Sequence, residues 1–108
     1  MSVPVSPESA FVTRVSQNTI NAIRWSPVTI DTLGNPATVT SYKIYKTTYP
    51  NGLNQTLFKT VTTLDILGVV DTMTIDATID PTMQYFYRVT AVSIAGEGDR
   101  SPEAADIS

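Results

Sequence analysis

Acidic residues are the side chains with the widest scope for chemistry in this sequence, which contains neither histidine nor cysteine. Histidine is the commonest general base and transition-metal ligand, so its absence closes the usual routes to acid–base and metal catalysis. Asp71, Asp76 and Asp80 fall on or beside one predicted strand, but their spacings of five and four residues do not place them regularly on one face. We therefore interpret them as solvated surface acids.

Known catalytic and ligand-binding motifs are missing as well. Serine and threonine are abundant, but no Gly-x-Ser-x-Gly elbow occurs, and without histidine no nucleophile–base pair can be assembled. There is no phosphate loop, zinc-ligand spacing or dinucleotide fingerprint. Asp65, Asp71 and Asp99 could contribute to a calcium site, but they lack the dense acidic loop that this ion prefers. The sequence thus predicts a protein without enzymatic activity, cofactor or metal.

The composition is typical of one lightly charged globular domain. The chain has 108 residues, of which 42% are hydrophobic and 16% charged, and its formal net charge is −3. Few lysines and arginines argue against a nucleic-acid partner, and no apolar run is long enough to predict membrane insertion. The first seven residues lack the basic and apolar regions of a signal peptide. With nucleic-acid binding and membrane insertion disfavoured, the composition favours a role through contacts of the protein's surface with other molecules.

The clearest strand pattern follows the turn signal at Pro81. From residue 85 the side chains alternate between two faces, as expected for a strand. The apolar face, which we predict to be buried, consists of Tyr85, Tyr87, Val89 and Ala91. The opposite face consists of Phe86, Arg88, Thr90 and Val92. Because this second face is mixed and carries a charge, it should meet water or a partner.

The stretch that begins at Ile79, followed by Ala95-Gly96-Glu97-Gly98 and Ser101, resembles the end of a fibronectin type III domain. In that family a tyrosine hydroxyl bonds back to upstream backbone in a "tyrosine corner", and Tyr85 matches its position. The resemblance implies an all-β, seven-stranded fibronectin type III, immunoglobulin-like β-sandwich over residues 8–108, preceded by an extended N-terminal arm over residues 1–7. From the strand patterns and the resemblance together, the predicted core residues are Trp25, Tyr42, Ile44, Ile75, Tyr85, Tyr87 and Val89.

Alternation and turn signals divide the rest of the chain into further strands. They are expected over residues 9–15, 19–25, 38–47, 55–64, 71–79 and 100–108. The inward side chains expected from the first and fifth of these are Phe11, Val15, Met73, Ile75, Ala77 and Ile79. In the second strand simple alternation would bury Asn21, so a β-bulge near Asn21 and Ala22 is predicted to return Ile20 and Ile23 to the core.

Three segments leave alternatives open. Residues 1–7 are either a disordered terminus or an arm that docks on a neighbouring subunit. The segment from Ser26 to Pro36 is more apolar than a free loop needs, and it either caps the open end of the sandwich or forms a contact site. The segment from Leu64 to Val70 is also unexpectedly apolar, and it packs under the sheet edge, forms a short extra strand or acts as a partner patch.

Outward side chains of two adjacent strands form the predicted partner face, which consists of Lys43, Tyr45, Arg88 and Thr90. The aromatic residues Tyr45, Tyr49, Phe58 and Phe86 are either an exposed surface for sugar or protein or ordinary packing. Cell-adhesion members of the family carry Arg-Gly-Asp in the last hairpin. Residues 96–100 read Gly-Glu-Gly-Asp-Arg instead, so integrin binding does not carry over. A glycosylation sequon begins at Asn54, and we attribute it to chance.

A single sandwich without catalytic chemistry predicts a structural or interaction protein. The chain starts at Met1 and is expected to end with its last strand, and its threonine-rich, cysteine-free make-up resembles domains that decorate tailed-phage particles. We therefore predict a virion protein that binds a larger capsid, tail or fibre protein and also contacts a glycan or protein of the host surface. The alternative is a spacer or binding module excised from a bacterial extracellular enzyme or a cell-surface protein, located outside the cell or on its surface.

Overall fold

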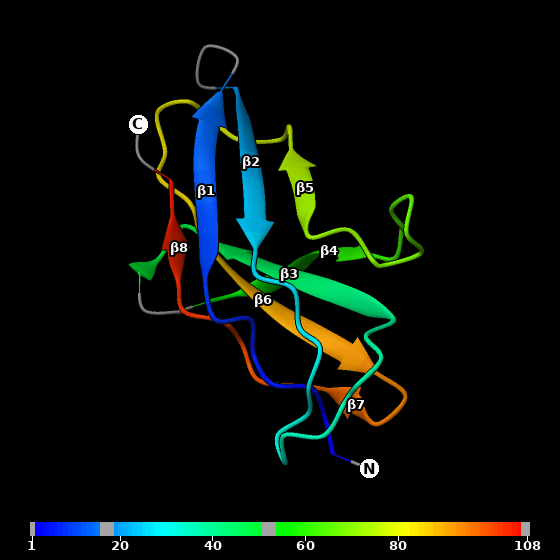
Figure 1. Ribbon diagram of the computed structural model, residues 1–108. Coiled ribbons are helices and arrows are strands. Elements are labelled where there is room, and N and C mark those ends of the chain that lie inside the picture. Colours follow the sequence, from blue (N-terminus) through cyan, green and yellow to red (C-terminus); the bar gives the residue numbers. More distant parts are fainter. Residues whose placement is uncertain (1, 16–18, 51–53, 107–108) are drawn as a thin grey trace.

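The computed structural model describes residues 2–15, 19–50 and 54–106, and in these the chain forms two antiparallel sheets packed face to face (Figure 1). The strands are β1 (Ala10–Val15), β2 (Ile20–Trp25), β3 (Ser41–Thr47), β4 (Thr56–Val61), β5 (Met73–Asp76), β6 (Phe86–Ser93), β7 (Gly96–Glu97) and β8 (Ala104–Ala105). The predicted all-β sandwich is confirmed. It has eight short strands rather than seven, because the end of the chain pairs with β6 twice, as β7 and as β8.

One sheet has the strand order β1-β2-β5 and lies in front in Figure 1. The other has the order β4-β3-β6-β7, with β8 also paired to β6, and crosses behind it. In β6 the side chains of Tyr87, Val89 and Ala91 are buried and face the core that the two sheets share. No helix that could span a membrane occurs in the described parts of the chain.

The core lies between the sheets and is built around β3 and β6. The predicted core residues Trp25, Tyr42, Ile44, Tyr85, Tyr87 and Val89 are all buried. The rings of Trp25 and Tyr42 lie 5.4 Å apart at 59°, a tilted arrangement that aromatic pairs prefer. The backbone N–H of Asp80 donates to the Tyr85 hydroxyl at 2.7 Å, which is the upstream contact that the tyrosine corner predicted.

The prediction that Ile75 belongs to the core is wrong. Its side chain is 40% exposed, and Met73 beside it is exposed as well, whereas Thr74 and Asp76 of the same strand are buried. The phase is reversed because the Asp76 carboxylate accepts hydrogen bonds inside the sandwich, and its register opposite Asn21 of β2 fixes the strand. Hydrophobicity alone therefore assigned the wrong face of β5 to the core.

The predicted β-bulge at Asn21 is also wrong. The ladder between β1 and β2 is regular from Ala10 opposite Trp25 to Val15 opposite Ile20, and Asn21 is 0% exposed. The same regular register turns Phe11 and Val15 outward, although both were expected to point inward. Polar partners inside the sandwich hold Asn21 there, so no bulge is needed to remove it.

The described part of the N-terminal arm packs on its own domain. Pro4 and Pro7 are buried, and Pro4 pairs with Asp31 in an isolated bridge. The N–H of Val5 donates to the Ile30 carbonyl at 3.1 Å, so the segment runs along the loop that follows β2. Residues 2–7 are therefore an integral part of the sandwich rather than a free arm.

Candidate functional site

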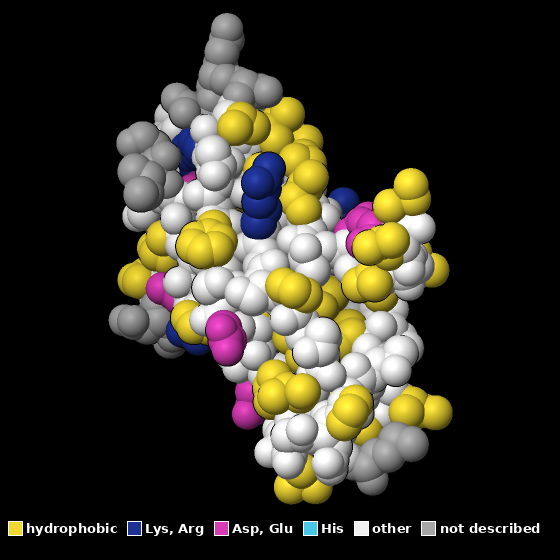
Figure 2. Space-filling view, in the orientation of Figure 1, with side chains coloured by type: hydrophobic (Ala, Val, Ile, Leu, Met, Phe, Trp, Pro, Cys, Tyr) yellow, Lys and Arg dark blue, Asp and Glu magenta, His cyan; other side chains and the backbone are white. Residues whose placement is uncertain are grey.

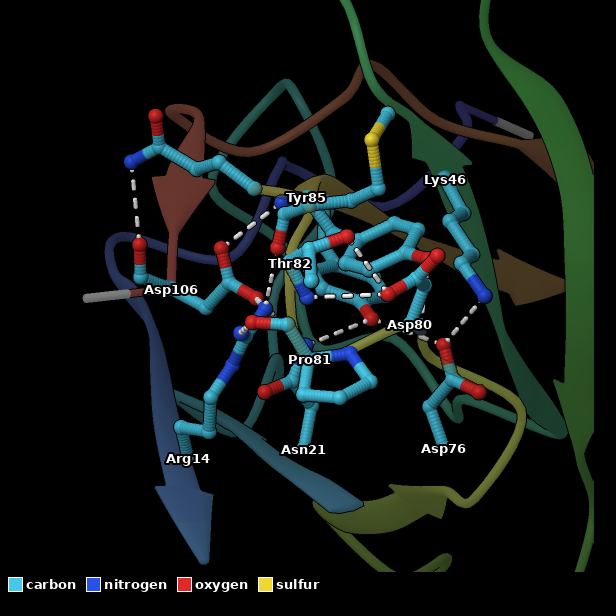
Figure 3. A network of polar contacts seen from close by, with 12 residues as sticks. Arg14, Asn21, Lys46, Asp76, Asp80, Pro81, Thr82, Tyr85 and Asp106 are labelled. Atoms are coloured by element: carbon cyan, nitrogen blue, oxygen red, sulfur yellow. Dashed lines mark hydrogen bonds and ion pairs between the residues drawn. The ribbon is translucent and has the colours of Figure 1, made fainter. Parts of the chain in front are cut away.

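Charged and polar side chains fill part of the interior between the two sheets (Figure 3). Each comes from a different element, and together they are Arg14 of β1, Asn21 of β2, Lys46 of β3, Asp76 of β5, Tyr87 of β6 and Asp106 after β8. We call these six residues the polar network. Burying such groups is costly unless they are paired and hydrogen-bonded, so their partners decide what the network can do.

Asp106 is the centre of one half of the network. Its carboxylate pairs with the guanidinium of Arg14, and both side chains are almost completely buried. The Asn21 amide donates to the same carboxylate at 2.9 Å, and the Tyr85 N–H donates to its other oxygen at 2.7 Å. The Arg14 guanidinium also donates to the backbone carbonyls of residues 81 and 83, as Figure 3 shows for Pro81. This half fixes the tyrosine corner to β1.

Asp76 is the centre of the other half. Its carboxylate accepts from the Lys46 ammonium at 2.6 Å and from the Tyr87 hydroxyl at 2.7 Å. Thr78 donates to it twice, from its N–H at 2.9 Å and its hydroxyl at 2.6 Å. The Tyr87 hydroxyl in turn accepts from the Asn21 amide at 3.0 Å, which joins the two halves.

The partners decide the ionisation of these groups. Burial alone would raise the pKa of Asp76, but hydrogen bonds from Lys46, Thr78 and Tyr87 lower it below its usual value. Burial raises the pKa of Tyr87, and the neighbouring Asp76 carboxylate raises it further. Asp76 is therefore an anion and Tyr87 a neutral hydroxyl at neutral pH.

The polar network connects the sheets and offers no reactive group to a ligand. Its anions are fully engaged by its cations and hydroxyls, and among the described residues no group of acidic side chains is arranged to hold a metal ion. Of the buried side-chain nitrogen and oxygen atoms of these six residues, Arg14 Nε and Asn21 Oδ1 lack a hydrogen-bond partner. The sequence analysis missed it because each member was considered in its own strand. The alternation of β2 places Asn21 inside the sandwich, which could have indicated buried polar partners. We predicted a β-bulge there instead.

The predicted partner face is largely occupied by the chain itself. Thr90 is buried, contrary to the prediction, because β7 lies beside β6 and places Glu97 over it, with the Thr90 hydroxyl donating to Glu97 at 2.7 Å. Tyr45 also donates to Glu97, and Lys43 lies 3.7 Å from it. Although burial alone would raise the pKa of Glu97, these donors lower it.

Arg88, the fourth residue of the predicted partner face, donates to the Ser101 carbonyl at 3.1 Å and lies 4.0 Å from Glu103. Lys43, Tyr45 and Arg88 remain partly exposed. Of the predicted aromatic surface, Tyr49 is exposed, whereas Phe58 packs against the core. This side of the molecule is therefore a network of internal polar contacts more than an open surface.

Apolar side chains gather instead on the outer face of the β1-β2-β5 sheet. The exposed members are Phe11, Val15, Met73 and Ile75. The strand registers place Phe11, Arg24 and Met73 in one row and Thr13, Ala22 and Ile75 in the next. Figure 2 shows hydrophobic side chains over these strands with a basic side chain among them. We call this surface the outer apolar face.

Comparison with known proteins supports the fold. No sequence family and no curated protein matches the chain. Among solved structures, an Fn3-like protein from Clostridium thermocellum is 22% identical, with a TM-score of 0.74, and the match covers 98% of this chain and 94% of that one. Titin kinase with its flanking domains is 18% identical, with a TM-score of 0.75, and the match covers 100% of this chain and 18% of that one.

A pectate lyase from Pectobacterium carotovorum matches 90% of this chain with 26% of its own, at 16% identity and a TM-score of 0.65. At such identities the likeness reports architecture alone. The sandwich topology, the tyrosine corner and the full-length match to an Fn3-like protein agree with one another. The chain therefore has the fibronectin type III fold.

Proposed function

We propose that this protein is a non-enzymatic interaction module that binds a larger structural protein of a virion, such as a capsid, tail or fibre protein. Fibronectin type III domains generally serve as interaction or spacer modules. The observation that carries the proposal is the outer apolar face. In this proposal the opposite sheet contacts a glycan or protein of the host surface. It does so through the partly exposed side chains of Lys43, Tyr45 and Arg88.

The outer apolar face has the composition of a contact surface. An antiparallel sheet that meets water on one side normally alternates between inward apolar and outward polar residues. Here β1 and β5 turn Phe11, 61% exposed, and Ile75, 40% exposed, toward solvent. Arg24 lies between these strands and forms no ion pair with any described residue. Aromatic residues, Met and Arg are the types enriched at protein interfaces.

The test is co-sedimentation with particles from the native source. Mass spectrometry of gradient-purified virions should find the protein at a fixed ratio to one major structural protein. A Phe11→Ser/Ile75→Ser variant should lose most of this association, by about tenfold or more, because two large apolar contacts are removed. Leu57→Ser is the control, since the exposure of Leu57 lies between those of Phe11 and Ile75 and Leu57 belongs to the other sheet. Absence of the wild-type protein from particles would reject the virion assignment.

A second candidate is a spacer or binding module beside other domains of an extracellular or cell-surface protein. It is favoured by two of the matched structures, in which this fold accounts for 18% of the titin kinase chain and 26% of the pectate lyase chain. The test is to recover the protein from secreted and cell-surface fractions and measure its mass. Peptides of a longer chain in those fractions would favour this candidate over the virion protein.

A further inference from the structure

The β1-β2-β5 sheet ends at β5, since among the described residues no strand pairs with β5 on the side away from β2 (Figure 1). An edge strand presents backbone N–H and C=O groups to solvent at every second residue, and another chain can pair with them. The hydrogen-bond pattern of the ladder between β2 and β5 decides which residues of β5 present these groups.

A hydrogen bond just beyond the end of β5 establishes this pattern. The Trp25 N–H donates to the Thr72 carbonyl at 3.1 Å, and the same register continues into β5. In an antiparallel ladder, pairs that exchange hydrogen bonds alternate with pairs that do not. The backbone groups of Thr74 are therefore directed at β2, whereas those of Met73 and Ile75 point away from it.

The opposite side of β2 gives the same result. The Ser26 N–H donates to the Ser9 carbonyl at 3.0 Å, so the even-numbered residues of β2 exchange hydrogen bonds with β1 and the odd-numbered ones with β5. Outside the ladders, no backbone hydrogen bond between described residues involves Met73 or Ile75. We call the N–H and C=O groups of these two residues the free edge of β5.

The other edges of the sandwich are covered, interrupted or very short. β8 lies beside β1 at the opposite end of the same sheet. In the second sheet, the ladder of β4 is interrupted by a β-bulge between Ile44 and Tyr45, next to Lys59, and β7 and β8 have two residues each. Bulges, lysines and short length disfavour the pairing of an edge strand with another chain. The ladder of β5 has no bulge, and β5 contains neither lysine nor proline.

The side chains beside the free edge are apolar. Met73 is 44% exposed and Ile75 is 40% exposed, and both belong to the outer apolar face. Asp76, the one charged residue of β5, is buried and pairs with Lys46 inside the sandwich. A strand added at this edge would therefore meet no uncompensated charge on β5, and its side chains would lie about 5 Å from those of Met73 and Ile75.

We infer that β5 binds an extended segment of another protein in which every second side chain is apolar. The segment's N–H groups donate to the carbonyls of Met73 and Ile75, and its carbonyls accept from their N–H groups. Its apolar side chains extend the outer apolar face by one strand. The loop between β4 and β5 protrudes on this side of the sheet (Figure 1), so a narrow segment fits the edge more readily than a second sandwich does.

This inference rests on the proposed function, since the segment would belong to the larger structural protein that contacts the outer apolar face. β5 has four residues, so backbone pairing alone makes a small contact. In strand addition, main-chain hydrogen bonds provide affinity and alternate side chains provide specificity. The neighbouring apolar side chains therefore supply the rest of the contact.

The first experiment uses the full chain, labelled with ¹⁵N, and a synthetic ten-residue peptide in which valine alternates with threonine between two terminal lysines. This probe should shift the amide signals of residues 73–76 and slow hydrogen exchange at Met73 and Ile75 by about tenfold. The Thr74 amide is the internal reference, because it is already directed at β2. An N-methylated probe without backbone donors, and a probe with serine in place of valine, should both bind about tenfold more weakly.

Proline variants test the backbone contact separately from the side chain. Ile75→Pro removes an N–H of the free edge and leaves the ladder with β2, because that N–H points away from β2. Ile75→Ala is the matched control, since it also loses the isoleucine side chain but keeps the N–H. Ile75→Pro should bind the probe about tenfold more weakly than Ile75→Ala. Met73→Pro and Met73→Ala repeat the comparison, and hydrogen exchange in the wild type tests the inference without any variant.

Unchanged spectra at millimolar probe, equal binding of the N-methylated probe, or shifts confined to β4 would each overturn the inference. Broadening of the signals of residues 73–76 with protein concentration, without peptide, would show that a second copy of this chain takes the edge instead. Co-sedimentation of Ile75→Pro and Ile75→Ala with virions separates the inference from the proposed function. Equal association of the two variants would reject the added strand alone, whereas absence of the wild type from particles would reject the virion assignment.

Discussion

Replacing Asp76 by asparagine removes one charge from the polar network while preserving the shape of the side chain. The asparagine oxygen can still accept both hydrogen bonds from Thr78, whereas the acceptor for the Lys46 ammonium and the Tyr87 hydroxyl is lost. Removing one partner of a buried ion pair costs about 3–5 kcal/mol, because the other charge is left without compensation.

Two features of Lys46 reduce this cost. Its side chain is 17% exposed, so some water reaches it, and its ammonium lies 4.7 Å from the Tyr85 ring centroid and 5.1 Å from that of Phe58. Such cation–π contacts contribute roughly 0.5–2 kcal/mol and remain in the variant. We therefore expect Asp76→Asn to lower the free energy of unfolding by about 2–4 kcal/mol.

The assay is urea denaturation at 25 °C, followed by tryptophan fluorescence from Trp25, at pH 7 and at lower pH. The folded pKa of Asp76 lies below its unfolded value of 3.8, so its carboxylate stabilises the fold above that pH and ceases to do so as pH falls through the folded pKa. The difference between wild type and variant should be full at pH 7 and shrink below about pH 4.

Two control variants test the cause. Asp99→Asn, at an exposed position, should change stability by about 0.5 kcal/mol or less. Lys46→Met/Asp76→Asn removes both charges and should be more stable than the sum of the single variants predicts. The reasoning is refuted if Asp76→Asn costs no more than Asp99→Asn, or if its cost is the same at pH 3 and pH 7.

Three further predictions test other contacts. Tyr85→Phe removes the acceptor of the Asp80 N–H and should cost about 1–3 kcal/mol in urea denaturation, and a neutral result would contradict a structural role for the corner. Gly98→Ala would place a Cβ 2.1 Å from the Pro4 carbonyl oxygen, so the N-terminal segment should detach and hydrogen exchange at the Val5 amide should accelerate. Ile75→Ser should cost under about 1 kcal/mol, since the residue is 40% exposed, whereas a cost above about 2 kcal/mol would show that it is core after all.

The fold could be predicted from the sequence because the patterns that indicate it lie within short stretches of the chain. The alternation from Tyr85 to Ala91, the proline before it and the glycines after it each follow from backbone geometry that a short stretch determines. The buried positions of Trp25, Tyr42 and Ile44 then followed from the resemblance to the family. The first six strands lie where the pattern predicted them, whereas the strand expected over residues 100–108 is reduced to β8, and β7 was not predicted.

Local patterns could not predict which side chains of the β1-β2-β5 sheet face the core and which face solvent. Phe11, Val15 and Ile75 are apolar and face solvent, whereas Asn21 and Asp76 are polar and face the interior. Each polar residue is inside because its partners come from other strands, distant in sequence. A rule that assigns faces by hydrophobicity fails when a paired network replaces part of the apolar core.

The sequence by itself determined the class of the molecule: an all-β sandwich with the fibronectin type III fold and a tyrosine corner at Tyr85. Only the tertiary structure decided which surfaces are open. It brought Glu97 over Thr90, exposed the outer apolar face, and joined buried polar side chains from separate strands into one network. The physical reason is that strand identity depends on neighbours in the chain, whereas exposure depends on which segments meet in space.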